Sequence, residues 1–332
     1  MTRMASLSFL QPRRVVLFGV ALSLGVFMGL GMSQAQTTNI TSSGLGTDIR
    51  PPVAGTTSIV GGTTAGTNLF HSFGNFSIGV HETARFAANN GQVNNSIDNI
   101  ISRVTGTNPS SLFGTLDTQS NFPTANFFLV NPNGIVFGPN ATLIVGGSFA
   151  ASTADYLKLT DGVTFYANPA LTTVLSIAPV AAFGFTSLRP ANISVQGSSL
   201  QVPTGATLAL VGGDLTIQGD AFLTGIPTLD APSGNVVLGS VASRGEALLG
   251  PVEQGKGLQM EGFSQLGRII IAPGSLISTA GESGGTVVIR GGQLTVDGSF
   301  IFSDTLGKLN GAPLAIDAEL TGATIITASL LT

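Results

Sequence analysis

Short apolar runs recur along the chain from Thr57 onward, and most of them end at Gly, Pro or Asn. They are rich in Val, Ile, Thr and Phe, the residues that suit a pleated, half-buried strand. Examples are Thr57–Val60, Phe127–Val130, Ile193–Gln196, Asp214–Ile217, Val236–Leu238, Arg268–Ile271, Val287–Ile289 and Leu294–Val296. The pattern therefore predicts an all-β protein built from many short strands.

One stretch allows two interpretations. Between Ser96 and Val104 the apolar residues fall at positions 97, 100, 101 and 104, the spacing of one face of a helix. The stretch is short and rich in β-branched residues, so strands fit it equally well. The pattern alone leaves helix and strand open here.

An internal repeat indicates how the strands are organised. Val211–Gly219 is similar to Arg290–Gly298, 79 residues further on, and Leu208–Leu210 is similar to Val287–Ile289. This offset equals about four units of about 20 residues, a size typical of solenoids. We therefore expect a β-helix, whose inward side chains stack from coil to coil, rather than a β-sandwich. Residues 158–191 have weaker strand signals, and we interpret them as a junction between an N-terminal module and plainer coils.

Composition narrows the class of protein further. Of 332 residues, 45 are Gly, 20 are Phe, two are Tyr and none is Cys or Trp, and charged residues make up 9%. So little charge excludes a coiled coil, and the absence of Cys excludes disulfides and thiolate zinc sites. The net charge of −4 and the lack of a Lys/Arg run argue against a nucleic-acid partner.

The N-terminus has the three parts of a secretory signal peptide. The first 14 residues contain three Arg and no acid, residues 15–32 are uncharged and mostly apolar, and Ser33-Gln34-Ala35 follows. The small residues favour cleavage between Ala35 and Gln36 over a transmembrane anchor. We therefore predict a signal peptide over residues 1–35.

Residues with catalytic chemistry are sparse. The two histidines, His71 and His81, lack the spacing of a metal site or a serine triad, and we interpret both as turn or surface residues. The string Gly250–Gly257 resembles a phosphate loop, but Lys256 is followed by Gly instead of Ser or Thr. Its composition therefore does not predict a nucleotide site.

The acids are scattered along the chain. Only Asp214, Asp220 and Asp297 suggest a stack on neighbouring coils, as a polysaccharide-cleaving β-helix would need. We expect no enzyme, no metal site and no cofactor.

The string Asn131-Pro132-Asn133-Gly134 is the most unusual one in the chain. Pro132 pre-sets φ for a turn, the two Asn side chains can bond their own backbone, and Gly134 accepts a positive φ. The string lies between two apolar runs, and Gly138-Pro139-Asn140 repeats the turn chemistry. Both strings therefore predict corners of a coil.

The region around this turn resembles a known family. Residues 126–141, including Asn131–Ile135, are similar to the Asn-Pro-Asn-Gly-Ile motif of two-partner secretion domains. These are the N-terminal modules of filamentous-haemagglutinin-like exoproteins, also described as the haemagglutination activity domain family. Supporting strings follow in the family's order: Asn68–Phe73 with Phe76, Ser96–Thr105, Gly106–Ser110, Gly114–Leu116 and Gly146–Phe149. Where many members have Asn-Pro-Asn-Leu, residues 94–97 read Asn-Asn-Ser-Ile.

The resemblance implies a right-handed, single-stranded parallel β-helix with N-terminal capping strands. It implies a secretion domain over 36–160 and further coils over 161–332, which we expect to be a truncated array. Asn131, Pro132, Asn133, Gly134 and Ile135 would be the secretion-motif residues. The Sec machinery would deliver the chain to the periplasm of a diderm bacterium. A dedicated outer-membrane β-barrel transporter would then bind the chain through its periplasmic POTRA domains.

The chain would fold outside the cell, with its N-terminal module nucleating the β-helix. We expect it to be secreted or on the cell surface, with an adhesin-like role. Further partners would be a glycan or protein on a host or neighbouring cell. Two alternatives are a polysaccharide-acting β-helix enzyme and the delivery portion of a contact-dependent toxin. The apolar end, residues 324–332, has no polar cap and is expected to associate.

Overall fold

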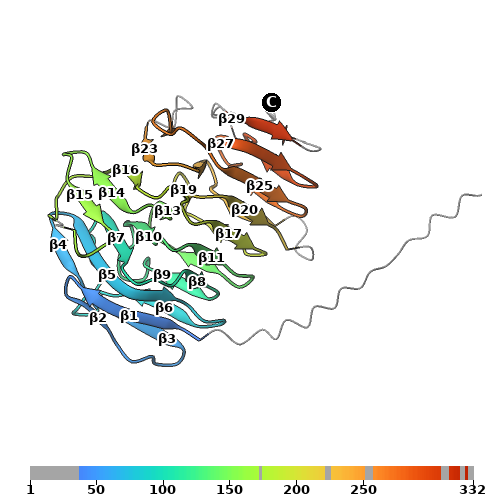
Figure 1. Ribbon diagram of the computed structural model, residues 1–332. Coiled ribbons are helices and arrows are strands. Elements are labelled where there is room, and N and C mark those ends of the chain that lie inside the picture. Colours follow the sequence, from blue (N-terminus) through green and yellow to red (C-terminus); the bar gives the residue numbers. More distant parts are fainter. Residues whose placement is uncertain are drawn as a thin grey trace, which may run out of the picture. The chain divides into compact units, whose positions relative to one another are not determined.

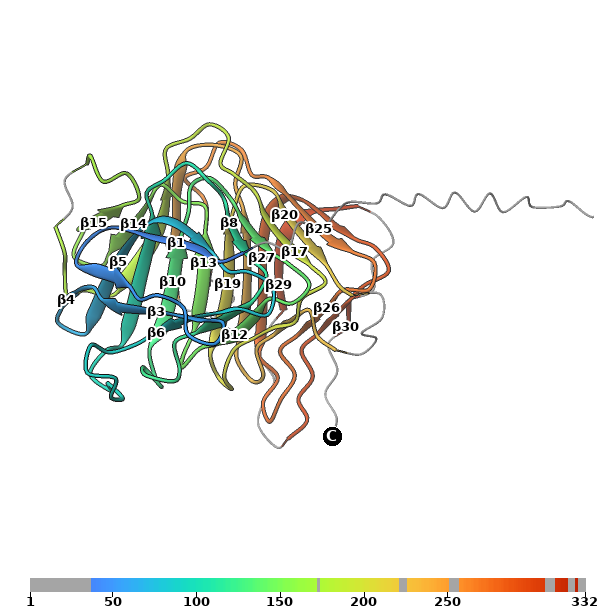
Figure 2. The ribbon, with the colours of Figure 1, turned by 90° about the horizontal axis from the view of Figure 1, so that it is seen from below.

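The described strands wind into a parallel β-helix with three faces (Figures 1 and 2). The computed structural model describes residues 37–171, 174–220, 226–250, 257–307, 314–321 and 326–327. Strands of successive coils lie beside each other in parallel and in register. Leu69, Ile100, Phe127, Phe149 and Leu208 form one such inward column across the coils. The expected all-β fold is confirmed.

The first two faces belong to one 15-stranded sheet. Its first face consists of β5 (Asn68–Ser77), β7 (Asn99–Val104), β10 (Asn126–Val130), β13 (Phe149–Ser152), β19 (Thr207–Gly212), β22 (Asn235–Ser240), β27 (Thr286–Val296) and β29 (Leu314–Thr321). Its second face consists of β8 (Ser110–Leu112), β11 (Ile135–Phe137), β17 (Ile193–Gln196), β20 (Leu215–Gln218) and β25 (Arg268–Ala272), and continues into β27.

The third face is divided into two five-stranded sheets, and within the described residues no ladder joins β12 to β18. The first of these sheets contains β2 (Thr47–Ile49), β3 (Thr56–Gly61), β6 (Thr83–Phe86), β9 (Thr115–Asp117) and β12 (Thr142–Ile144). The second contains β18 (Leu200–Gln201), β21 (Leu229–Asp230), β26 (Leu276–Ser278), β28 (Phe300–Phe302) and β30 (Ile326–Thr327).

Antiparallel strands precede the first parallel coil. β1 (Asn39–Gly44) and β4 (Thr63–Ala65) pair with β5, and β2 pairs with β3. They agree with the expected N-terminal capping strands. The predicted cleavage site, Ala35 and Gln36, lies outside the described residues. Among the described residues, no helix is long and apolar enough to cross a membrane.

Of the ambiguous stretch at 96–104, residues Asn99–Val104 form the strand β7, and no part of it is helical. Ile100 faces the interior of the coils, whereas the next residue, Ile101, packs into a second core outside them. Because both faces of this strand are buried, consecutive residues are apolar and imitate a helical period. Burial on both sides therefore explains the misleading pattern.

Two insertions leave the coils and meet on the outside of the first face. They carry β14 (Tyr156–Leu159), β15 (Thr164–Tyr166) and β16 (Val180–Phe185), and then β23 (Gly245–Leu249) and β24 (Leu258–Gln259). These strands form one antiparallel sheet, here called the outer sheet, in which β16 pairs with β23. The region expected to be a junction is thus an insertion that packs on the helix. The expected boundary at 160/161 falls within it, between β14 and β15.

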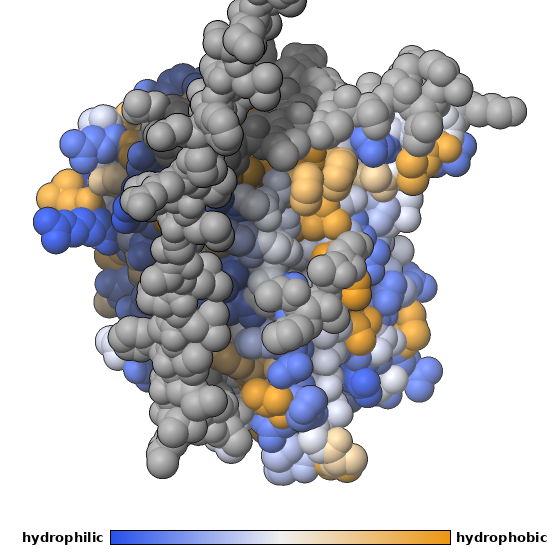
Figure 3. All heavy atoms as spheres, turned by 90° about the vertical axis from the view of Figure 1, so that its right-hand side faces the viewer, coloured by the Kyte–Doolittle hydropathy of each residue, from blue (hydrophilic) through white to orange (hydrophobic). Residues whose placement is uncertain are grey.

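The molecule has two apolar cores. Inward residues of all three faces fill the interior of the coils. Phe70, Ile101, Val130, Val211 and Val237 point outward from the first face and pack against the outer sheet. Burial on both sides explains why so few charged residues occur, since an unpaired charge in either core would be costly. On the face seen in Figure 3, hydrophilic and hydrophobic residues are interspersed over the coloured surface.

The 79-residue repeat spans two coils, so the expectation of four short units was wrong. Leu208 pairs with Val236, which pairs with Val287. A plain coil takes 27 residues, from Val287 to Leu314. The coil from Val236 to Val287 takes 51 because it contains the second insertion. An insertion inside the period therefore made the coils appear shorter than they are.

Candidate functional site

The Asn-Pro-Asn-Gly string forms the corner between β10 and β11, as expected. The main-chain N–H of Asn131 donates to Ser152 O in the next coil (2.9 Å), and that of Gly134 donates back to Asn131 O (3.2 Å). Gly134 has a φ of 115°, a value that favours glycine. Ile135 is fully buried in the interior, whereas Pro132 and Asn133 are half-buried.

Asn131 is fully buried, and its amide is completely used. Its Nδ2 donates to Asn108 O and to Ser110 Oγ, both at 3.0 Å, in the coil below. Its Oδ1 accepts the main-chain N–H and the Nδ2 of Asn133, also at 3.0 Å each. Because an unpaired buried amide is costly, this side chain holds the two corners together.

Asn133 adds a further tie, since its Nδ2 donates to Gly106 O at 2.8 Å. On the other side of the corner, the N–H of Ile135 donates to Asn192 O at 3.2 Å. The string thus connects three successive coils. It also lies directly on Gly106–Ser110, so the structure brings two of the family-like strings together.

Three other family-like strings meet the start of β10 at the opposite end of the first face. Asn99 Nδ2 donates to Asn68 Oδ1 at 2.8 Å, and Asn126 Nδ2 donates to Asn99 Oδ1 at 3.0 Å. Asn126 Oδ1 then accepts the N–H of Ser148 at 2.8 Å. One asparagine ladder therefore runs along the starts of four neighbouring strands, β5, β7, β10 and β13.

The Asn-Asn-Ser-Ile string at 94–97 lies apart from the motif corner, in the turn before β7. Asn94 Oδ1 accepts the N–H of Ser96 at 2.9 Å and its hydroxyl at 2.6 Å. Ile97 is buried in the interior. This turn therefore closes locally without the proline that many family members have here.

The interpretation of His71 as a turn or surface residue was wrong. His71 lies in β5, is buried in the interior, and its Nδ1 is 3.2 Å from the hydroxyl of Thr47 in the capping strand β2. Burial lowers the pKa of His71 to about 3, so the ring is neutral at neutral pH. His81 is exposed in a turn with a φ of 61°. The sequence does not reveal this burial by an alternation of apolar and polar residues, because the neighbours Phe70 and Ser72 are buried as well.

Two of the acidic residues make structural contacts. Asp214 forms an ion pair with Arg268 of the next coil at 3.0 Å. Asp155 accepts the N–H groups of Thr186 and Ser187, at 2.6 and 3.3 Å. In the part of the chain that the structure describes, no three His, Asp or Glu side chains gather as metal ligands. Much of the phosphate-loop-like string, residues 251–256, lies outside the described residues.

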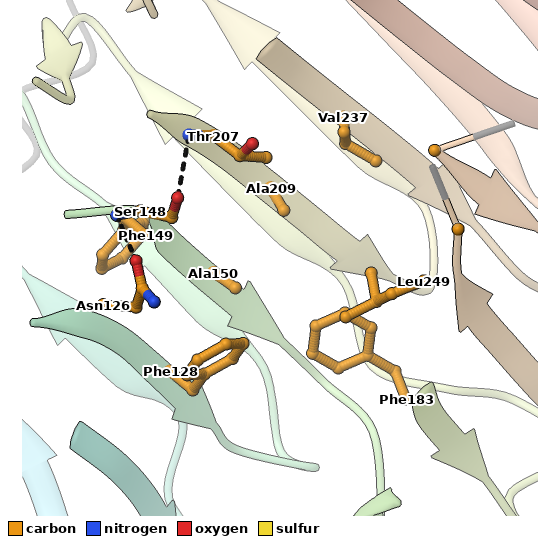
Figure 4. A pocket seen from close by; sticks show the side chains of 12 residues that line it. Asn126, Phe128, Ser148, Phe149, Ala150, Phe183, Thr207, Ala209, Val237 and Leu249 are labelled. Atoms are coloured by element: carbon orange, nitrogen blue, oxygen red, sulfur yellow. Dashed lines mark hydrogen bonds between the residues drawn. The ribbon is translucent and has the colours of Figure 1, made fainter. Parts of the chain in front are cut away.

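An apolar cleft of about 220 Å³ opens between the first face and the outer sheet (Figure 4). Phe128, Ala150 and Ala209 line it from the first face, and Phe183 and Leu249 line it from the outer sheet. Along one rim, Ser148 Oγ accepts the N–H of Thr207 at 3.0 Å, which extends the asparagine ladder. The cleft is therefore the open margin of the second core.

Comparison with known proteins gives the family. The sequence profile of the TPS secretion domain matches residues 35–296. The HMW1 secretion domain from Haemophilus influenzae is 18% identical, with 85% of this chain and 65% of that chain covered and a TM-score of 0.43. A filamentous hemagglutinin secretion domain is 14% identical, with 89% and 100% covered and a TM-score of 0.45.

This chain thus spans about 65% of the length of the HMW1 structure. No curated protein sequence matches it. The profile match alone covers well over half of the chain. The chain therefore belongs to the TPS secretion domain family, the secretion modules of two-partner secretion exoproteins.

Proposed function

We propose that this chain directs its own export through a cognate outer-membrane transporter and then acts at the cell surface as an adhesin. Membership of the family implies such a transporter and secretion through the outer membrane. In this proposal Sec delivers the chain to the periplasm, and cleavage between Ala35 and Gln36 releases it. The POTRA domains of the transporter bind the chain before it folds.

The observation that carries the proposed role of the motif is the burial of Asn131. A side chain with no exposed surface, and with every amide hydrogen bond made inside the protein, offers nothing to a transporter once the coil has closed. Asn131 therefore acts by closing the corner over the preceding coil. Each closed coil then presents a new strand edge to the next, which makes folding outside the membrane progressive.

The test compares two asparagines of the same coil. Asn131→Ala removes the buried ties, whereas Asn140→Ala changes an exposed side chain in the neighbouring corner. Both variants are expressed with the cognate transporter, and the chain is quantified in the medium and the periplasm. We expect Asn131→Ala to accumulate in the periplasm and Asn140→Ala to be exported normally.

Refolding of the purified variants distinguishes closure of the corner from direct recognition. If Asn131→Ala is exported poorly and also refolds slowly, the motif acts through folding. If export falls while refolding and stability are unchanged, the transporter reads Asn131 directly. Undiminished export of Asn131→Ala and Asn133→Ala would remove the motif from the export mechanism.

A further inference from the structure

The only two tyrosines of the chain are neighbours on the solvent side of the outer sheet. Tyr156 in β14 is the register partner of Tyr166 in β15, with ring centroids 5.3 Å apart at 54°. Both are partly exposed, whereas eleven phenylalanines of the described chain are buried in the two cores. Tyrosine presents a large rigid ring together with a polar tip, which suits it to recognition surfaces.

The ring of Tyr156 lies flat on the sheet. A Cβ added to Gly184, its partner on β16, would be only 2.0 Å from the Cε2 and Cζ atoms of this ring. Its hydroxyl donates to Glu246 Oε1 at 2.9 Å, and Glu246 also pairs with Lys158 at 3.0 Å. One face of the ring thus covers Gly184, and the opposite face points away from the sheet. The tyrosines and this ion pair are here called the tyrosine platform.

A cleft of about 410 Å³ adjoins the platform at Tyr166. It lies between the outer sheet and the motif corner, and its polar lining includes Asn133, Asp155 and Asn168. Each of these side chains is held by one end: Asn133 Nδ2 by Gly106 O, Asp155 Oδ2 by two N–H groups, and Asn168 Oδ1 by the N–H of Ala170. Within the described residues, Asn133 Oδ1, Asp155 Oδ1 and Asn168 Nδ2 make no hydrogen bond and remain available to a ligand.

This combination fits a sugar. The C–H face of a pyranose is apolar and packs against an aromatic ring, while its hydroxyls need fixed donors and acceptors. The platform supplies ring faces, and the three side chains that line the cleft, each fixed by its own hydrogen bonds, supply two acceptors and one donor. The charges of Lys158 and Glu246 balance each other, which leaves Asp155 as the one acid lining the cleft. We propose that the tyrosine platform and its cleft bind a neutral glycan chain.

The composition of the protein provides the assay. Because the chain has no Trp and both Tyr lie on the platform, its intrinsic tyrosine fluorescence reports this surface alone. The full secreted chain is titrated with cellohexaose, maltohexaose and N-acetylchitohexaose, by fluorescence and by calorimetry. We expect a saturable signal with at least one of them. Tyr166→Ala and Tyr156→Ala should each weaken binding by about tenfold or more.

Three further variants serve as controls. Phe300→Ala removes an exposed ring, 45% accessible and stacked on Phe302, from a distant coil, and should bind like the wild type. Tyr156→Phe keeps the ring, so it should retain more affinity than Tyr156→Ala. Asn168→Ala alters an exposed side chain of the cleft and should weaken binding without unfolding the outer sheet. Circular dichroism establishes that each variant is folded.

Two results would overturn the proposal. One is a flat titration with all three hexasaccharides. If the periplasmic domains of the transporter change the tyrosine fluorescence instead, the platform is a protein-binding surface. The other is wild-type affinity in folded Tyr156→Ala and Tyr166→Ala variants.

Discussion

The early coils have an aromatic interior, whereas the interior of the later coils is aliphatic. Among the described residues every buried Phe lies at or before Phe185, and the buried hydrophobic residues of the interior from Ile193 onward are all Ile, Val, Leu or Ala. Rings touch from coil to coil in the early part, for example Phe86 with Phe127 at 5.0 Å and Phe127 with Phe149 at 6.0 Å. The side-chain hydrogen bonds between coils differ as well, because the asparagine ladder and the motif corner belong to the early coils.

This contrast shows which residues give a coil a sequence that other coils cannot replace. Each aromatic ring fits one particular gap, and each buried amide needs one particular set of partners. Columns of Val, Ile and Leu repeat with little change and accept one another. The early coils therefore carry the distinctive motif strings, although the family profile extends through the later coils to residue 296.

The largest effect should follow from removing an early ring. Phe127 lies between two other rings, so Phe127→Ala leaves a cavity and should lower the free energy of unfolding by about 3–5 kcal/mol. Ile271→Val in a later coil should cost about 0.5–1.5 kcal/mol. Urea unfolding measures both, and equal losses would contradict a special role for the aromatic interior.

The motif corner should come next. Asn131→Ala leaves Asn108 O and Ser110 without their amide partner and should cost about 1–3 kcal/mol. The exposed Asn140→Ala should stay within about 0.5 kcal/mol of the wild type. A similar loss in both variants, measured by urea unfolding, would mean that burial of the amide does not explain the corner.

A pH-dependent effect should arise from His71. Since burial lowers its pKa from 6.5 to about 3, its contribution is complete above pH 6.5 and is lost as the pH falls toward 3. By pH 5 the loss should be about 2 kcal/mol. The unfolding free energies of the wild type and His71→Gln at pH 7 and pH 5 isolate it, because the carboxylates contribute alike to both proteins.

The smallest effect on the free energy of unfolding should come from a surface ion pair in the later coils. Arg268 and Asp214 are 60% and 35% exposed, so Arg268→Ala should cost about 0.2–1 kcal/mol, and less at high salt. Arg85→Ala in the early coils should cost more, because it deprives Asp117, only 2% exposed, of its cation. The reverse order in thermal unfolding would weaken the contrast between early and late coils.

Much of the fold could be predicted from local patterns. The short strands and the coil corner at 131–134 are where their sequence indicates them, because strand propensity and turn chemistry act over a few residues. The outer sheet could not be predicted, since β16 meets β23 some 60 residues later along the chain. The two-sided burial of β7 and the insertion within the repeat misled pattern analysis for the same reason.

The candidate site was only partly predictable. The motif residues were evident from their turn chemistry and their resemblance to the family. The burial of Asn131 was not, because it depends on Asn108 and Ser110 lying directly below it. His71 was missed because a buried and a surface histidine look alike in a strand whose two faces are both covered.

The backbone hydrogen bonds between β16 and β23 close a loop of the chain that begins in one insertion and ends in the other. The coils that contain β17 to β22 lie between the two strands of this junction along the chain. In the progressive folding proposed above, β16 pairs with β14 first and keeps one edge unpaired until β23 has followed and turned back onto it. Once Phe183 lies opposite Ala247, the enclosed coils cannot unwind from their end without first parting this junction. In the proposed export, this junction therefore makes a late step of folding hard to reverse once the chain has passed through the transporter.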